Sequence, residues 1–441
     1  MSTHPILLEK LNEGVNPEIG FGKTRRDLRL PAIPGKAHAV IGMRRSGKTT
    51  FLRQLQAERR EATSPEQAVY LSFEDDRLTD LPAAQLSQLL EEFFRRFPRL
   101  RGRETVTLYL DEIQLVAGWE RFVRRILDSE RVEVVLSGSS ARLLSREIHT
   151  SMRGRSVASV IRPFSFREFL RHRRDEPEVS PGALTPAQRS AVEHRFREYM
   201  RQGGFPEAQG LAPDARVLLL QGYVDTVLFR DIVERHGVRQ VSALRWLIRH
   251  CLRNPGGLVS MHRFYADLRA QGYAVSKDTL HELFAYLSDA FLVSAVPFSA
   301  DAERVRNTNP RKIYPADPAL IHAFAPGLRP QEGHTLETVI MLELERRGAA
   351  LSYVRTRSGF EVDFLALFPD GKEELIQVCS DPGSPGAGVR ELRVLEEASR
   401  EHPRARKRLL VLEREEGLTP GAPDVAVGTA WAWLLGGESP P

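Results

Sequence analysis

The sequence lacks the features that mark secreted and membrane proteins. Its 441 residues include only two cysteines, Cys251 and Cys379. Two thiols so far apart do not form the disulfide framework of a small secreted domain. No window approaches the roughly 18 successive apolar residues that a membrane-spanning helix needs. The first residues lack the basic segment and apolar run of a signal peptide. These absences predict a cytoplasmic protein.

The chain also has no large excess of one charge, because 63 basic residues nearly balance 58 acidic ones. An apolar fraction of 41% is enough for packed cores, and the length predicts two to four domains. The basic residues are mostly arginine, and nine arginines stand between positions 142 and 174 beside only two glutamates. Such a block either faces phosphate groups or forms a solvated surface, and charge patterning alone leaves both interpretations open.

Short apolar runs alternate with helical patterns through the first third of the chain. This alternation favours an α/β fold with a parallel sheet covered by helices. A helical region follows, and then three short helices precede two strands, which is the order of a winged helix. Ser260 and Ser276 are predicted to cap the second and third of these helices. We expect four parts: a parallel-sheet α/β core at 1–175, a helical lid at 176–238, a winged helix at 239–325 and a small α/β domain at 326–441.

The segment GMRRSGKT, which begins at Gly42, has the phosphate-loop spacing G-x-x-x-x-G-K-[ST] and lies between an apolar strand and a helix. Glycines let backbone N–H groups turn onto phosphate oxygens, and the following helix adds its positive end. Lys48 would pair with the β- and γ-phosphates, and the Thr49 hydroxyl would bind magnesium. The segment predicts ATP and Mg²⁺ as cofactors. The residues expected to contact the nucleotide are Gly42, Arg44, Arg45, Ser46, Gly47, Lys48, Thr49 and Thr50.

A second acidic motif, VTLYLDE, ends an apolar strand at Asp111 and Glu112. A carboxylate at the end of a buried strand needs a positive partner, and Mg²⁺ is the natural one for Asp111. Glu112 is then the candidate general base that polarises the attacking water. The next apolar strand ends in hydroxyls, and Ser139 or Ser140 would lie beside the γ-phosphate if this strand neighbours both motif strands. Ser137 and Ser139 are equally well interpreted as plain turn residues.

Several of these segments together resemble the archaeal-type AAA+ ATPases, a prokaryotic family whose members carry a carboxy-terminal winged helix and nuclease-like fold of uncharacterised function. The resemblance covers nearly the whole chain and implies ATP hydrolysis in a homo-oligomer, for example a hexameric ring. The segments that carry it are GMRRSGKTTFLRQ, YLSFEDDRL, LYLDEIQ, VVLSGSSARLLSREI, MRGRSVASVIRPFSFREFL, YMRQGGFPE and VLFRDIVERHGV.

The resemblance also suggests roles for residues outside the two nucleotide motifs. Ser139 resembles the sensor position, and Arg153 and Arg155 resemble the arginine that reaches the γ-phosphate of a neighbouring subunit. An ordinary pair of surface arginines is the alternative. Arg230 and Asp231 resemble a recurrent pair in the lid, or form a surface ion pair of little energetic weight.

In the last domain, Glu337 on a helix and Asp363 at a strand end have the order of the PD-(D/E)xK nucleases. Those enzymes need a second acid and a lysine on the next strand, to hold metal and activate water. Here Gln377 stands at the position of the second acid and Cys379 at the position of the lysine. A neutral amide is a poor magnesium ligand, and a thiol cannot replace the ammonium. The sequence therefore predicts a degenerate nuclease site, retained for DNA contact or assembly, and an active nuclease is the alternative that Gln377 and Cys379 disfavour.

The presumed wing carries four basic residues that could contact DNA phosphates without sequence specificity: Arg304, Arg306, Arg311 and Lys312. Protein–protein packing is the alternative use of a winged helix. We expect an ATPase that couples hydrolysis to DNA translocation or remodelling, as in a helicase or branch-migration motor. The alternative is an ATP-dependent switch that controls assembly or partner binding.

Overall fold

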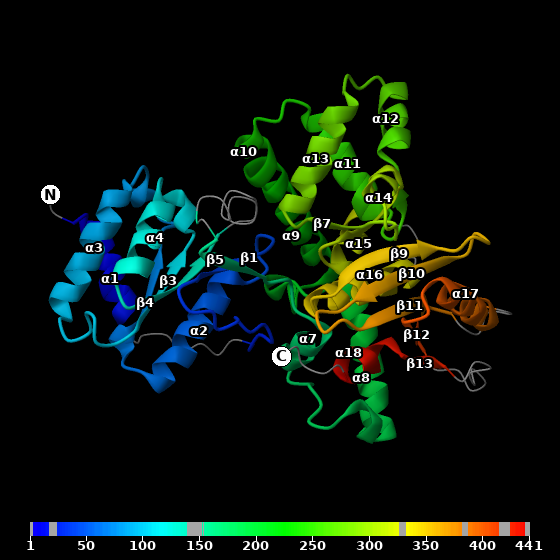
Figure 1. Ribbon diagram of the computed structural model, residues 1–441, viewed down its shortest axis with the longest axis horizontal. Helices are drawn as coiled ribbons and strands as arrows, with labels where there is room; N and C mark the ends of the chain where they lie inside the picture. The colour runs from blue at the N-terminus through cyan, green and yellow to red at the C-terminus, as the bar shows by residue number, and fades with distance from the viewer. Residues whose placement is uncertain are drawn as a thin grey trace. The chain divides into compact units, whose positions relative to one another are not determined.

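The structure is a computed structural model that describes all residues except 1–2, 17–23, 139–151, 153, 326–331, 382–386, 414–423 and 437–441. The chain forms two compact units, residues 1–162 and 163–441 (Figure 1). Each unit has its own sheets and cores, so each is considered separately.

The first unit is a five-stranded sheet in the order β2-β3-β4-β1-β5. Every pair of neighbouring strands is parallel. The predicted α/β class and parallel P-loop sheet are therefore confirmed. Its elements are α1 (Pro5–Val15), β1 (Ala37–Ile41), α2 (Lys48–Ala62), β2 (Ala68–Ser72), α3 (Ala83–Arg96), β3 (Val106–Asp111), α4 (Trp119–Ser129), β4 (Val132–Ser137) and β5 (Ser156–Val160).

Helices cover both faces of this sheet, and the strand sequences reflect that. Side chains alternate along β2, so Tyr70 packs with Phe51 of α2, whereas Leu71 faces the opposite layer beside Leu89 and Phe93 of α3. Every residue of β3 is buried, because a strand covered on both faces has no solvent side. The carboxyl ends of these strands meet at one edge of the sheet, where open α/β folds bind their ligands.

The second unit begins with helices and contains two further sheets. Its first half comprises α7 (Phe166–Arg173), α8 (Pro186–Gln202), α9 (Pro213–Thr226), a π-helical segment (Val227–Val233), α10 (Glu234–His236), α11 (Val241–Arg253), β6 (Leu258–Val259), α12 (Met261–Ala270), α13 (Lys277–Asp289), β7 (Val293–Val296), α14 (Glu303–Thr308), β8 (Arg311–Pro315) and α15 (Pro318–Phe324).

The region predicted as a winged helix contains α11, α12 and α13 and a small antiparallel sheet of order β6-β8-β7. The two predicted caps are confirmed: the Ser260 hydroxyl accepts from the backbone N–H of Arg263, and the Ser276 hydroxyl from that of Thr279. Between β7 and β8 the chain forms the short helix α14.

The C-terminal sheet has the order β13-β12-β11-β10-β9, in which β9, β10 and β11 are antiparallel and β11, β12 and β13 are parallel. Two cores lie on its two faces. The expected additional α/β domain is therefore present. Its elements are α16 (Glu332–Arg346), β9 (Ala350–Arg355), β10 (Glu361–Leu367), β11 (Glu373–Cys379), α17 (Ala387–Glu401), β12 (Arg406–Val411), β13 (Val425–Thr429) and α18 (Ala430–Gly436).

In two of the segments that carry the family resemblance, the structure explains why those residue types are required. Ser165 and Glu168 of FSFREF form a reciprocal capping box at the start of α7. In RQGGF, a side chain on Gly204 would lie 2.2 Å from the carbonyl oxygen of Phe164, so only glycine fits. The backbone N–H of Gly204 also donates to the buried carboxylate of Asp317, at 2.7 Å.

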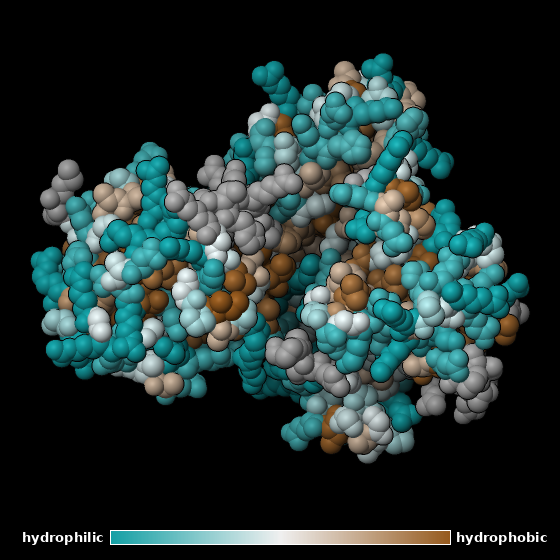
Figure 2. All heavy atoms as spheres, in the orientation of Figure 1, coloured by the Kyte–Doolittle hydropathy of each residue, from teal (hydrophilic) through white to brown (hydrophobic). Residues whose placement is uncertain are grey.

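In the described residues, no helix combines the length and apolar character needed to span a bilayer. The face drawn in Figure 2 is mostly hydrophilic over the helices of both units, with hydrophobic residues showing only in places.

Candidate functional site

The phosphate loop joins β1 to α2, and its glycines adopt conformations that other residues rarely take. Gly42 has φ 149° and Gly47 has φ 101°. A side chain on Gly42 would lie 2.1 Å from the carbonyl oxygen of Ile161, on the segment that follows β5. Gly47 is the N-cap of α2 and provides no side-chain cap, so the first N–H groups of the helix are available to an anion.

The polar groups of this loop suit a bound polyphosphate. The Lys48 ammonium is buried and donates to the carbonyl oxygens of Gly42 and Met43, at 3.0 and 3.1 Å, which holds it inside the loop. The Ser46 hydroxyl is fully buried and has no hydrogen-bond partner among the residues that the structure describes. A buried donor without a partner is costly unless a ligand satisfies it. The loop therefore fits a nucleotide phosphate, which Lys48 and the backbone N–H groups would hold.

The remaining predicted nucleotide contacts lie on the same loop and the first turn of α2. Arg44 is half-buried and Arg45 is exposed in a left-handed conformation. Thr49 is exposed at the start of α2 and Thr50 is half-buried. The Thr49 hydroxyl is thus accessible to a metal ion bound by phosphate.

Asp111 ends β3 and is 2% exposed. Its carboxylate accepts the Tyr70 hydroxyl at 2.6 Å and also the hydroxyl of Ser137, at the end of β4. Burial, followed by the charge of Asp111, raises the pKa of Tyr70, so the phenol stays protonated and is the donor. Asp111 would bind Mg²⁺ together with Thr49 and the phosphates. The bound metal ion would neutralise the charge of the phosphates during phosphoryl transfer.

Glu112 follows Asp111 in a left-handed conformation with φ 54°. This turn directs the chain away from the strand, and Gln114 donates to the Glu112 carboxylate. Burial raises the pKa of Glu112, and Lys48 opposes that shift. A carboxylate with a raised pKa is a better proton acceptor than an ordinary one, as a general base requires.

The other predicted catalytic positions fall on or near a segment that the structure does not describe. Ser139 and Arg153 lie outside the described residues, as does Ser140. Arg155 is described, on the surface of the first unit, where it pairs with Asp128 of α4.

Arg26, which the motifs did not indicate, stabilises the phosphate loop through hydrogen bonds. Arg26 is 4% exposed, and its guanidinium donates to the carbonyl oxygen of Ser46 at 2.9 Å and to that of Arg162. Its backbone N–H donates to the side chain of Gln54 on α2, at 3.1 Å. The arginines around positions 25–29 are the sequence feature that could have indicated this role. Charge alone, however, does not distinguish a buried arginine that stabilises a loop from an arginine on the surface.

The FRDI segment forms the π-helical turn of the second unit. Asp231 is buried, whereas Arg230 is exposed. π-Helical turns are often found at functional sites.

The predicted degenerate nuclease site contains a lysine that the sequence pattern indicated as a DNA contact on the presumed wing. Lys312, from β8, is 3% exposed rather than on a DNA-accessible surface. Its ammonium lies 3.0 Å from Glu337 of α16, 2.9 Å from Asp363 of β10 and 3.1 Å from Glu361. These carboxylates raise its pKa although burial opposes the shift. The prediction of Lys312 as a DNA contact is thus replaced by a buried ionic cluster.

Within this cluster, the Lys312 ammonium has no N–H donor left to give to a substrate. An ammonium has three N–H donors, and three carboxylates occupy them. The Tyr314 hydroxyl also donates to Glu337, at 2.6 Å. Burial, with the charge of Asp363 next, raises the pKa of Glu337.

Gln377 and Cys379 occupy the positions expected for them on β11. The side chain of Gln377 accepts from the backbone N–H of Asp363 at 3.2 Å and donates to Glu391 at 2.8 Å. Cys379 is a buried free thiol. In the described parts of the chain, no group of three or more histidine, cysteine, aspartate or glutamate side chains is arranged to hold a metal ion.

The other three predicted DNA contacts are near the surface of the second unit. Arg304 and Arg306 are exposed on α14, and Arg311 is half-buried at the start of β8. Arg306 donates to the carbonyl oxygen of Ala300 at 3.0 Å, which fixes the helix to the preceding loop.

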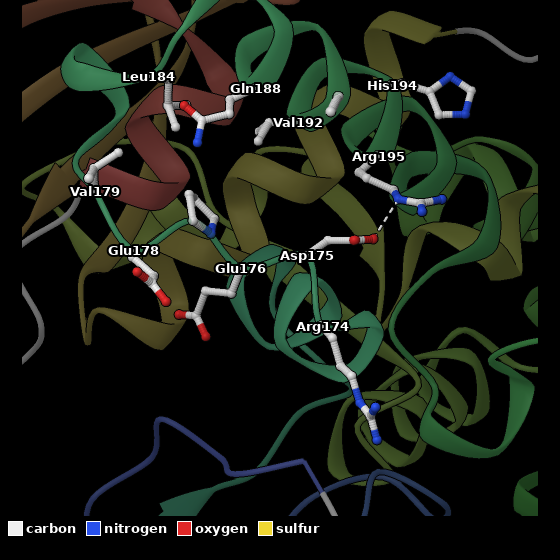
Figure 3. A pocket seen from close by; sticks show the side chains of 12 residues that line it. Arg174, Asp175, Glu176, Glu178, Val179, Leu184, Gln188, Val192, His194 and Arg195 are labelled. Atoms are coloured by element: carbon white, nitrogen blue, oxygen red, sulfur yellow. Dashed lines mark hydrogen bonds and ion pairs between the residues drawn. The ribbon is translucent and has the colours of Figure 1, made fainter.

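A cavity of about 640 Å³ lies in the second unit, between the end of α7 and α8. Figure 3 shows Asp175 directed toward Arg195, with which it pairs at 2.8 Å. Glu176 pairs with Arg171 at 2.6 Å. All of its lining residues lie between positions 174 and 195, and none of them belongs to the nucleotide motifs.

Comparison with known proteins gives matches over most of the chain. Residues 34–170 match the family model described as "AAA domain", and residues 193–332 match a "Domain of unknown function (DUF8612)". "Uncharacterized protein MJ1544" from Methanocaldococcus jannaschii is 32% identical over 360 residues, which are 80% of this chain and 77% of that protein. An "Uncharacterized protein" from Haemophilus influenzae is 29% identical over 330 residues, which are 74% of this chain and 78% of that protein.

Among solved structures, the Walker-type ATPase PABY2304 of Pyrococcus abyssi matches with a TM-score of 0.39 and 16% identity, over 73% of this chain and 95% of that one. The Aeropyrum pernix ORC1 protein, solved in complex with DNA, matches with a TM-score of 0.27 and 17% identity, over 74% of this chain and 93% of that one.

The phosphate loop, the acidic strand end and the parallel sheet thus occur in a chain whose first unit matches an AAA domain and whose length largely aligns with an archaeal relative. The chain belongs to the archaeal-type AAA+ ATPases.

Proposed function

We propose that this protein hydrolyses ATP with Mg²⁺ and uses the energy to move or remodel DNA. The observation that carries the proposal is the arrangement of Lys48, the buried Ser46 hydroxyl and Asp111 around the carboxyl ends of β1 and β3. Mg²⁺, when bound, would neutralise charge on the β- and γ-phosphates. Lys48 and the N-terminus of α2 bind the phosphates, and Glu112 takes the proton of the attacking water.

The DNA part of the proposal is supported by Arg304 and Arg306. They extend from α14 into solvent, in a region that also contains the helices α11, α12 and α13. Exposed guanidinium groups bind phosphate oxygens without reading bases, so the expected binding is independent of sequence. The degenerate nuclease-like domain would contribute assembly or DNA contact, and no cleavage.

The DNA proposal is tested by measuring DNA affinity against salt concentration for Arg304→Ala/Arg306→Ala. If both side chains contact phosphates, the slope of log K against log salt falls by roughly 0.9 for each contact removed. Arg103→Ala/Arg121→Ala removes the same charge from exposed positions on the first unit and is the matched control. Equal slopes for the two double variants, or no DNA binding by the wild type at low salt, would refute the proposed contact.

A switch without strand movement is the second candidate, and the burial of Lys312 favours it. The presumed wing has one exposed cation fewer than its sequence indicated. In a switch, the nucleotide state controls assembly or partner binding, and turnover is slow. ATPase assays with single-stranded, duplex and branched DNA separate the two functions: stimulation by DNA supports the motor, and unchanged turnover supports the switch.

A further inference from the structure

The carboxylate of Asp111 is held from both sides by hydroxyl groups on the neighbouring strands. On one side, the Tyr70 hydroxyl of β2 donates to Oδ2 at 2.6 Å. On the other, the Ser137 hydroxyl of β4 donates to Oδ1. Because β3 lies between β2 and β4 in the sheet, one residue from each neighbour reaches the same carboxylate.

These bonds fix the direction of the carboxylate without consuming its capacity to bind a metal. A carboxylate oxygen has two lone pairs, so it can accept one hydroxyl and still face a metal ion or a metal-bound water. Hydrogen bonds to the ligand oxygens of a metal site orient those ligands and influence the affinity for the metal.

Tyr70 is itself held by the helix that follows the phosphate loop. The guanidinium carbon of Arg53, on α2, lies 3.3 Å from the centre of the Tyr70 ring. A cation over an aromatic face is attracted by the ring and limits its movement. The contacts therefore connect α2 to Asp111 through Tyr70, and Ser137 also accepts from the backbone N–H of Glu112, at 3.4 Å.

A second tyrosine provides an internal comparison. Tyr109 of β3 is the register partner of Tyr70 and belongs to the same core cluster on the α2 side of the sheet. Both rings are 3% exposed. The hydroxyl of Tyr109, however, donates to the carbonyl oxygen of Leu55 at 3.1 Å and not to a carboxylate.

We propose that Tyr70 is a positioning residue for the metal of the ATPase reaction, which it serves by holding the Asp111 carboxylate in its metal-binding orientation together with Ser137. The proposal rests on the proposed ATP hydrolysis. In this role Tyr70 acts through the Asp111 carboxylate, so loss of its hydroxyl should weaken the response to Mg²⁺ and leave metal-free nucleotide binding intact.

The test measures ATPase activity of the full chain against free Mg²⁺ for the wild type, Tyr70→Phe and Tyr109→Phe. Removing a partner of a metal ligand typically costs about 10- to 100-fold in metal affinity or activity. We expect Tyr70→Phe to raise the Mg²⁺ concentration for half-maximal activity by about that factor. ATP binding in the presence of a chelator should stay within about twofold of the wild type. Tyr109→Phe, which loses a similarly buried hydroxyl, should keep the wild-type Mg²⁺ dependence.

Ser137→Ala is the second variant, because it removes the opposite hydrogen bond to Asp111 and changes no aromatic packing. It should shift the Mg²⁺ dependence in the same direction. If Tyr70→Phe and Ser137→Ala both respond to Mg²⁺ as Tyr109→Phe does, Tyr70 has only a structural role. If the wild type hydrolyses no ATP at any Mg²⁺ concentration, the proposed function fails and this role fails with it.

Discussion

Replacing Lys312 with methionine tests the buried ionic cluster of the second unit. Methionine has a similar length but no charge, so the change removes the ammonium and leaves the packing nearly unaltered. The carboxylates of Glu337, Asp363 and Glu361 would then face one another without a cation. Removing one partner of a buried ion pair costs roughly 3 to 5 kcal/mol, because the remaining charge is uncompensated.

We expect Lys312→Met to lower the free energy of unfolding of the second unit by about that amount. Urea denaturation followed by tryptophan fluorescence reports mainly on this unit, since Trp246, Trp431 and Trp433 are three of the four tryptophans. The double variant Lys312→Met/Glu337→Gln should recover part of the loss, because it also removes one of the repelling charges.

Lys372→Met is the matched control, since Lys372 pairs with Asp370 at an exposed turn of the same domain. Exposed pairs contribute little to stability, so its unfolding transition should stay close to that of the wild type. If Lys312→Met unfolds at the same urea concentration as this control, the ammonium does not neutralise the cluster and the assignment is wrong.

Three further predictions concern the nucleotide and DNA contacts. Glu112→Gln should lower kcat by about 100-fold or more while ATP still binds. In the wild type, the acid limb of the pH–rate profile should lie above the ordinary glutamate pKa, because burial raises the pKa of Glu112 and activity is lost as pH falls through it. Gly42→Ala should abolish nucleotide binding in calorimetry, because its side chain would overlap the backbone at Ile161, whereas Gly222→Ala, which meets no atom within 4 Å, should bind normally. Wild-type DNA binding should weaken steeply with salt, and a binding constant that salt leaves unchanged would exclude phosphate contacts by Arg304 and Arg306.

The parts of the fold that the sequence predicted are those fixed by local patterns. Strand–helix alternation predicted the parallel sheet, because a strand buried on both faces must be apolar throughout. The phosphate loop was recognisable because glycine spacing and the strand and helix on either side lie within one short segment. Ser260 and Ser276 were identified as caps for the same reason, since a cap depends on residues three positions away.

The residues that no sequence pattern indicated depend on contacts between distant segments. Tyr70 and Asp111 are 41 positions apart and meet only because β2 and β3 are neighbours in register. Arg26 donates a hydrogen bond to the carbonyl oxygen of Ser46, which lies 20 positions further along the chain. Lys312 was misplaced because a run of basic residues indicates an exposed surface, whereas β8 directs this side chain toward carboxylates from α16 and β10.

The phosphate loop and Asp111 are together expected to bind ATP with Mg²⁺. Isothermal titration calorimetry of the full chain with Mg²⁺ and a non-hydrolysable ATP analogue tests it most directly, beside Lys48→Ala and Asp111→Asn. We expect one site per chain in the wild type, loss of binding in Lys48→Ala, and binding without Mg²⁺ dependence in Asp111→Asn. No heat of binding in the wild type, or equal binding by Lys48→Ala, would contradict it.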